Sequence, residues 1–445
     1  MLETDILIKL AETACEAAIS MGAEFADVGT SNGRSLSVEL ESSAIKSCDA
    51  NLSGRISVRA IYRGGTGWSS TDKLNAESAA EAGRNAARLA KLAEPDPDFK
   101  SLPAPADHYP EVPGLCDPAV ASMDVKQIIR FSLENIDSAL AVAPGSVVSG
   151  GFSSHYSAQA LVNSLGIRLA DEDTIIGGHT MVVVRRGDDV GSFYDFDSAR
   201  VLSDFAPEGL GAKAAEQALK FLGARKIETA TMPIVLGPLT AWRTLRSVFS
   251  HADAEGVQRG RSYMIGKVDE KIASDLLTLT DDPLIPRGMA SRAYDSEGVP
   301  SRPLTLVENG VLKTYLYSSY TAGKAGVAPT GHGTRSGGAA PSNTNPKPGA
   351  MMTADEIIKN TENGLYINIG SLSPNPTTGD VSASVDFGFK IEKGELAYPV
   401  ASTLIGGRFL DMLSNIDAIS SDYREEPGMI MPTIRIKDVL VAGGK

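Results

Sequence analysis

The chain has 445 residues, which is too long for one ordinary domain, so we expect two or three domains. Apolar residues make up 42% of it and charged residues 22%, as in a globular protein, and no window offers the roughly 20 apolar residues of a membrane span. The net charge of −13 repels phosphate backbones and no basic patch offsets it, so direct nucleic-acid binding is not expected.

The first unit is predicted to span residues 1–93 and to consist of a helix, strands and a second helix. Apolar and polar residues alternate over residues 36–40 and 56–62, which is the pattern of half-buried strands, and a turn is expected between them at residues 51–54. An alanine-rich run of about residues 74–93 follows an N-capping sequence and is predicted to be the second helix.

A proline-rich connection follows at residues 94–118. Seven of its 25 residues are proline, which cannot continue a helix or a central strand, so we expect an extended segment. The order of helix, strands and helix then repeats over residues 119–225, which form the second predicted unit. Its strands are expected around residues 147–152, 159–163, 179–185 and 192–196, and its last helix near residues 211–222.

The pattern changes in the third region, residues 230–445, which we expect to be a strand-rich C-terminal domain. A buried-type strand at residues 233–236 leads into a helix of about residues 240–249, and a further helix is suggested near residues 353–361. Residues 325–350 contain six glycines, four prolines and no acid. A loop of this length is either a functional element or a mobile surface connection.

Motifs of known catalytic sites are absent. The glycine-rich run at residues 331–338 lacks the Gly-Lys-Ser/Thr of a phosphate-binding loop, and no Gly-x-Ser-x-Gly nucleophile motif occurs. No two of the five histidines fall within five residues of each other, so no helix presents two imidazole ligands on one face. His251 with Asp253 and Glu255 could hold a hard cation weakly, but a solvated helix end explains these residues better.

The three cysteines are widely spaced and form no CxxC pair, so the sequence offers no thiolate metal site. An odd number of cysteines indicates a reducing compartment. The first helix-like segment is acidic, unlike a signal peptide. We therefore expect a cytoplasmic protein.

A series of motifs in the C-terminal region resembles the PmbA/TldD family. In chain order the matching sequences are EGVQRGRS (255–262), MIGKVDEKIA (264–273), DDP (281–283), RAYDSEGVP (292–300), VENGVLK (307–313), YSSY (317–320), TGH (330–332) and PSN (341–343). The resemblance implies an α+β fold, in which two N-terminal helix–strand–helix units precede a strand-rich, barrel-like C-terminal domain.

The family has two kinds of subunit, and the resemblance places this chain with the TldE (PmbA) type. TldD-type chains carry a His-Glu-x-x-x-His helix, which supplies zinc ligands and a base, and a further cysteine near the C-terminus. Here the corresponding residues 250–256 read SHADAEG, so the glutamate beside the first histidine and the second histidine are both missing, and no cysteine follows Cys116. We therefore assign no catalytic residue and no metal ligand to this chain, and expect zinc in the partner subunit.

By resemblance, the chain is expected to be the non-catalytic subunit of a cytosolic heteromeric zinc metallopeptidase. Its partners would be a TldD-type subunit and an unfolded peptide, cleaved in peptide maturation or antitoxin-type turnover, and neither nucleic acid nor membrane is expected. Two alternatives stay open. One is a stand-alone binding or scaffold protein, in keeping with the older family label "modulator of DNA gyrase"; the other is an autonomous hydrolase, which the missing ligands disfavour.

Five residues are candidates for contact with the substrate or the partner. Arg259 and Arg261 could bind a peptide carboxylate or a partner acid as bidentate donors, or be simple surface arginines. His332 and Arg335 could reach a shared cavity from the glycine-rich loop, or only decorate that loop. His251 completes the set, because it stands where a TldD-type chain has its first metal ligand.

Overall fold

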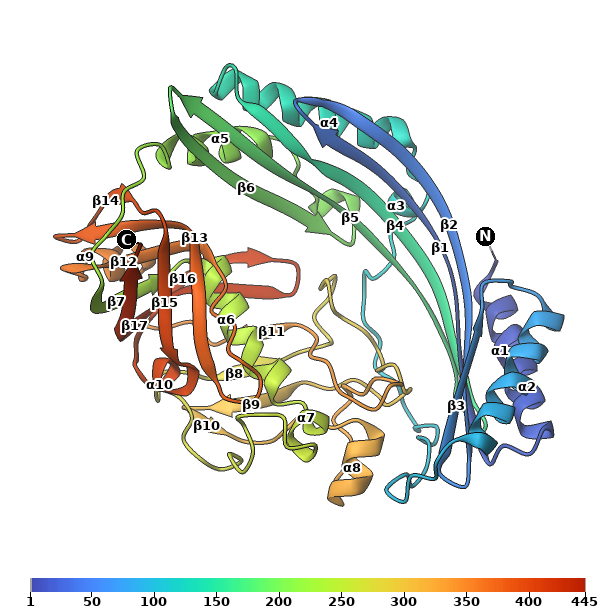
Figure 1. Ribbon diagram of the computed structural model, residues 1–445. Helices are drawn as coiled ribbons and strands as arrows, with labels where there is room; N and C mark the ends of the chain where they lie inside the picture. Colours follow the sequence, from blue (N-terminus) through green and yellow to red (C-terminus); the bar gives the residue numbers. More distant parts are fainter. Residues whose placement is uncertain (1, 445) are drawn as a thin grey trace.

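One curved antiparallel sheet combines strands from both N-terminal units in the computed structural model, which describes residues 2–444. Its order is β3-β2-β1-β4-β5-β6, with β1 (Phe25–Glu41), β2 (Ala44–Tyr62), β3 (Gly65–Thr71), β4 (Val147–Asn163), β5 (Arg168–Arg186) and β6 (Asp189–Ala199). β1 pairs with β4 from Asp27↔Asn163 to Leu40↔Gly150, so the two units meet in a single ladder. Figure 1 shows this sheet arching over the C-terminal domain.

β2 runs without interruption through residues 51–54, so the turn predicted there is wrong. Asn51 pairs with Ser35 of β1, and ladder pairing on both sides of it holds this polar stretch in an extended conformation. The chain reverses instead at Ser42 and Ser43, whose φ angles of 51° and 61° suit a two-residue hairpin turn. The two stretches predicted separately in the first half of the second unit are likewise parts of one strand, β4.

Helices cover the convex face of the sheet at its two ends (Figure 1). At one end lie α1 (Thr4–Ser20) and α2 (Ala76–Leu92); at the other lie α3 (Pro118–Ala121), α4 (Val125–Val142), the short 3-10 helix Leu202–Asp204 and α5 (Leu210–Lys220). Even-numbered strand residues such as Val28, Val38 and Phe152 are buried beneath these helices. The predicted helices at 74–93 and 211–222 are confirmed by α2 and α5.

A closed ring of five strands forms the core of the C-terminal domain, which confirms the barrel-like α+β fold. The ring contains β12 (Asn363–Gly370), β7 (Ala230–Leu236), β17 (Met429–Gly443), β15 (Thr403–Arg408) and β13 (Asp380–Glu392) in that order, and β13 pairs back to β12. β14 (Glu395–Pro399) and β16 (Ile416–Glu426) extend it. α6 (Pro238–His251) follows β7 and buries Leu245, Val248 and Phe249 in the largest apolar core.

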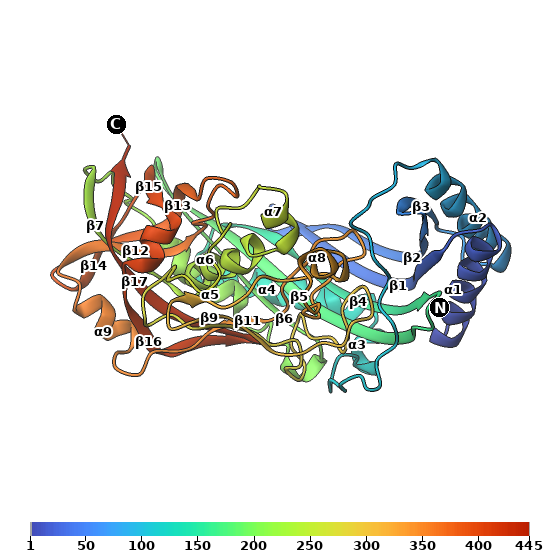
Figure 2. The same ribbon diagram turned by 90° about the horizontal axis from the view of Figure 1, so that it is seen from below.

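A small second sheet and several short helices connect the barrel to the arch. The sheet has the order β10 (Val311–Leu312), β9 (Leu304–Glu308), β8 (Leu279–Asp281) and β11 (Thr344–Pro346). The short helices are α7 (Ala254–Gln258), α8 (Ser319–Ala325), α9 (Ala354–Lys359) and α10 (Phe409–Ser414). Figure 2 shows that α1 and α2 lie at one end of the molecule and the barrel at the other, with these connecting segments between them.

The proline-rich connection adopts no helix or strand between α2 and α3 in the described chain. It is hydrogen-bonded to the arch and to the C-terminal domain. Leu115 O accepts a hydrogen bond from Thr174 N of β5 at 2.9 Å, and Pro113 O accepts one from Arg287 N of the C-terminal domain at 3.0 Å. Within residues 2–444, no helix is long and apolar enough to cross a bilayer.

Candidate functional site

The segment that the sequence resemblance aligns with the zinc-peptidase motif of TldD-type chains is broken at its centre. α6 ends at His251 and α7 begins at Ala254, so the intervening residues are not helical. The Asp253 carboxylate caps α7 by accepting the Glu255 N–H at 3.2 Å, and it also accepts the Ala339 N–H of the glycine-rich loop at 2.9 Å. Asp253 is therefore occupied in holding a helix start and a loop together. We call His251, Asp253, Glu255 and Arg259 the α6–α7 corner.

His251 is half-buried and held by its own helix. Its Nδ1 lies 2.6 Å from the Ser247 carbonyl oxygen, and its ring centroid lies 5.1 Å from that of Tyr263. Burial lowers the pKa of the imidazole, and the hydrogen bond to Ser247 opposes that shift only in part. The neutral ring is therefore favoured.

The two arginines near this corner point to solvent. Arg259 pairs with Glu255 at 2.8 Å one helical turn away, in an exposed geometry of little energetic weight. Arg261 is exposed, and its side chain makes no hydrogen bond or ion pair within residues 2–444. In that part of the chain no three His, Cys, Asp or Glu side chains gather as metal ligands. A corner with one imidazole and two structurally engaged carboxylates does not fit the three-ligand set of a catalytic zinc site.

The glycine-rich loop is packed inside the protein. The His332 side chain is fully buried, with its Nε2 at 2.9 Å from Asp281 Oδ2 and its Nδ1 at 3.0 Å from Thr330 O. The backbone N–H of Ser342 also donates to Asp281, at 2.8 Å, and so does the Ser342 hydroxyl. In this conformation His332 fixes the loop to β8 and faces no solvent.

Arg335 binds the glycine-rich loop to the arch. Its Nε donates to the Asp27 carboxylate, and its Nη2 donates to Ser57 O at 2.9 Å. Arg59 donates to the other Asp27 oxygen at 2.6 Å and to the Arg335 carbonyl at 2.7 Å, while both guanidinium groups lie over the Trp68 ring. Residues more than 300 positions apart thus form one buried ion network.

Two further buried carboxylates complete this contact. Glu297 lies 4.0 Å from Arg59 and accepts the Ser319 N–H at 2.7 Å, and Asp295 accepts the Gly333 N–H at 2.7 Å. Burial raises the pKa of Glu297 to about 7, and the neighbouring Asp295 charge adds to that shift. We call Asp27, Arg59, Glu297 and Arg335 the interdomain cluster.

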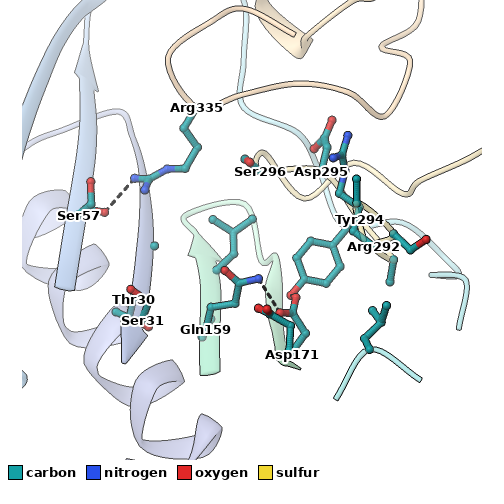
Figure 3. Close-up of a pocket in the computed structure, with 18 of the residues that line it drawn as sticks. Thr30, Ser31, Ser57, Gln159, Asp171, Arg292, Tyr294, Asp295, Ser296 and Arg335 are labelled. Carbon is teal, nitrogen blue, oxygen red and sulfur yellow. Dashed lines mark hydrogen bonds between the residues drawn. The ribbon is translucent and has the colours of Figure 1, made fainter. Parts of the chain in front are cut away.

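A cavity of about 490 Å³ lies beside this cluster, between the concave face of the arch and the C-terminal domain. Figure 3 shows Arg335 extending toward Ser57 on one side of it and Tyr294 extending toward Asp171 on the other. Such a volume is within the range of small-ligand sites. Neither His251 nor the two candidate arginines of the α6–α7 region line it, whereas Arg335 does.

Family models cover most of the chain. Models described as PmbA/TldA metallopeptidase domain 1, central domain and C-terminal domain match residues 26–90, 118–222 and 229–443. The chain belongs to the PmbA/TldD metallopeptidase family. The second and third matches each begin one residue before the ranges 119–225 and 230–445 of the second unit and the C-terminal domain and end inside them.

Individual PmbA/TldD proteins are similar over nearly the whole length. Metalloprotease PmbA of Escherichia coli O157:H7 is 26% identical over 98% of this chain and 96% of its own. The structure of TldE from Thermococcus kodakarensis has 25% identity and a TM-score of 0.88, covering 98% of this chain and 100% of that one. A Bacteroides thetaiotaomicron structure described provisionally as a modulator of DNA gyrase has 26% identity and a TM-score of 0.87, covering 98% of both chains.

Sequence reasoning found the PmbA/TldD motifs but missed most residues of the site. Asp27 and Arg59 lie on alternating strands that look ordinary in sequence, and only the fold brings them to Arg335. Glu297, Arg292 and Tyr294 were visible as parts of the RAYDSEGVP motif without any individual role. The signal that the sequence offers there is three charged residues, Arg292, Asp295 and Glu297, within six positions of this motif.

Proposed function

We propose that this chain is the TldE-type subunit of a TldD/TldE-type cytosolic peptidase, in which a TldD-type partner holds the zinc. The observation that carries the proposal is the donor set of the α6–α7 corner. It offers one imidazole, from His251, and two carboxylates that cap a helix and pair with Arg259. Hydrolysis by a zinc enzyme needs a metal-bound water and a base, so the chemistry is assigned to the partner chain.

The proposed role of this chain is to bind and orient an unfolded peptide at a cavity that both subunits enclose. Exposed residues near the α6–α7 corner suit the contact with the partner, because Arg261 has no internal partner within residues 2–444 and Arg259 is only loosely held. The similarity to TldE of Thermococcus kodakarensis over the whole chain supports the subunit type.

The test measures cleavage of a fluorogenic unstructured peptide by this chain, by a TldD-type chain, and by their mixture, with and without a chelator. We expect chelator-sensitive activity only in the mixture. Comparable cleavage by this chain alone would overturn the proposal. Elemental analysis of the dialysed chain gives an independent reading: close to one zinc per chain, lost in His251→Ala, would also contradict it.

A second candidate is a binding protein that acts without a peptidase partner. The observation in its favour is the description of the Bacteroides thetaiotaomicron structure as a gyrase modulator. The net charge of −13 gives no support to direct contact with DNA. Size-exclusion chromatography separates the candidates, because the TldE-type role requires a stable complex with a TldD-type chain and the second candidate does not.

A further inference from the structure

The acidic side chains that line the 490 Å³ cavity are all satisfied by the protein. Asp171 accepts the Tyr294 hydroxyl and, at 2.6 Å, the Gln159 amide, a contact drawn in Figure 3. Asp173 pairs with Arg200 at 3.2 Å. Asp295 accepts three backbone N–H groups, at 2.7 to 3.0 Å. Each of these carboxylates therefore has its hydrogen-bonding partners inside the protein.

Two of the four arginines that line the same cavity are satisfied as well. Arg200 donates to Asp173 and to the carbonyl oxygens of Gly288 and Met289, at 3.1 and 2.7 Å. Arg335 is bound to Asp27 in the interdomain cluster. These two guanidinium groups are therefore structural.

Neither of the other two arginines forms an ion pair within residues 2–444, although the Asp281 and Asp295 charges act on Arg292 from beyond ion-pair distance. Arg292 makes one side-chain hydrogen bond, 3.3 Å long, to Ala340 O, and its Nε is buried with no partner. Arg55 is exposed, and its single hydrogen bond is a 3.5 Å contact with Ser70. A guanidinium group carries five N–H donors, and leaving a buried one unpaired is costly. The cavity thus presents two arginines with N–H donors that have no acceptor, and an anion can supply one.

The surrounding surface suits an extended chain. Odd-numbered residues of β4 lie on the same concave face as Gln159; Ser153 and Ser157 have short side chains, and His155 between them is exposed. A second cavity of about 500 Å³ lies farther along this face, at Gly151 and Ser153. From Gln159 to Gly151 a strand advances about 26 Å at roughly 3.3 Å per residue. The two cavities are therefore spaced for one extended peptide rather than for a compact metabolite.

We propose that Arg292 and Arg55 bind the carboxylate of an extended peptide substrate in this cavity. The carboxylate is the C-terminal group or an Asp or Glu side chain, since both offer the same bidentate acceptor to a guanidinium group. This inference rests on the proposed function in taking a peptide as the ligand. It adds that peptides with a suitably placed carboxylate are held by this chain while the partner cleaves them.

The experiment measures fluorescence anisotropy of an N-terminally labelled unstructured peptide with the full chain, alone and with a TldD-type partner. Three probes share one sequence: a free C-terminus without acidic residues, the same peptide amidated, and the amidated peptide with one internal Glu. Arg292→Gln and Arg55→Gln are compared with Arg186→Gln, which lies at the opposite end of β5 from the cavity and is exposed.

We expect at least one carboxylate probe to bind about tenfold more tightly than the amidated peptide, the range of a charge-assisted hydrogen bond. Tighter binding of the first probe assigns the C-terminal group, and tighter binding of the third assigns a side chain. Arg292→Gln should abolish this difference, Arg55→Gln should reduce it, and Arg186→Gln should preserve it. Thermal unfolding of each variant shows whether it folds. If Arg292→Gln does not fold, Arg55→Gln still tests the inference, because Arg55 is exposed.

Equal binding of all three probes, or a difference that survives both Arg292→Gln and Arg55→Gln, would overturn the inference. Competition by inorganic phosphate and not by acetate would overturn the assignment to a carboxylate. Peptide cleavage by the mixture, measured beside binding, distinguishes a failure of this inference from a failure of the proposed function. Carboxylate-dependent binding without cleavage by the mixture would contradict the peptidase role alone, and cleavage insensitive to amidation and to Arg292→Gln would contradict this inference alone.

Discussion

The α6–α7 corner and the interdomain cluster use the same kinds of residue for opposite purposes. The sequence resemblance aligns the corner with the zinc motif of TldD-type chains, yet its Asp253 caps a helix and its Glu255–Arg259 pair is partly open to solvent. The cluster lies where no catalytic motif was expected, yet the Asp27 and Arg59 side chains are only 5% and 8% exposed. Of these two regions, the contact between the arch and the C-terminal domain is therefore the one in which ion pairs are buried.

That comparison predicts a large loss of stability from Asp27→Asn. The change removes the carboxylate that both Arg59 and Arg335 share, so Arg335 loses its ion pair and Arg59 keeps only the longer one with Glu297, at a cost of about 3–5 kcal/mol. Trp68 lies under both arginines and is one of two tryptophans, so its fluorescence in a Trp242→Phe background reports on this region. Urea unfolding followed in this way checks the effect. A loss below about 1 kcal/mol would put the cluster on a level with a surface pair.

The stability of the folded chain should depend on pH through Glu297. Its folded pKa of about 7 is above the ordinary value of 4.5, so the folded state holds the proton more tightly than the unfolded chain does. The resulting stability is full below about pH 4.5 and is lost as the pH rises through about 7. The wild type should lose about 3 kcal/mol over this range relative to Glu297→Gln, which carries no titrating group. Urea unfolding midpoints that change equally with pH in the wild type and in Glu297→Gln would refute the assignment of this pH dependence to Glu297.

Arg335→Ala should release the glycine-rich loop without unfolding the barrel. Asp27 keeps Arg59 as a partner, so the effect is local, and we expect protease cleavage within residues 325–350 to accelerate about tenfold, or about 1.4 kcal/mol. Mass spectrometry of the first fragments gives the site and the rate. Arg259→Ala is the matched control, because its ion pair is exposed and it lies in the other region. Equal rates of cleavage within residues 325–350 in the two variants would show that Arg335 holds the loop no more firmly than the exposed Arg259 pair does.

The smallest effect is expected at the corner itself. Glu255→Gln breaks an exposed pair with Arg259 and should cost less than about 1 kcal/mol. Thermal unfolding of the isolated chain checks this. If the variant keeps the stability of the isolated chain but lowers the activity of its mixture with a TldD-type chain, the corner serves the partner contact. A loss of several kcal/mol in the isolated chain would show that the corner is a structural centre instead.

The sequence by itself determined the local structure and the family. Alternation and capping residues located most helices and strands, because these depend on residues only a few positions apart. The spacing of the histidines excludes a helix with two imidazoles on one face, since that too is a local property. The motifs of residues 255–343 pointed to the family and to its α+β fold, which the domain matches and the five-stranded ring confirm.

Only the tertiary structure decided which residues meet. The turn at residues 51–54 failed because pairing with β1 overrides the local preference of polar residues. Asp27 and Arg335 are 308 positions apart, and no spacing rule relates them. His332 was indistinguishable in sequence from an exposed loop residue, yet Asp281 holds it in the interior. The cavity and its two unpaired arginines exist because a curved sheet and a barrel approach each other, and that approach is set by packing over the whole chain.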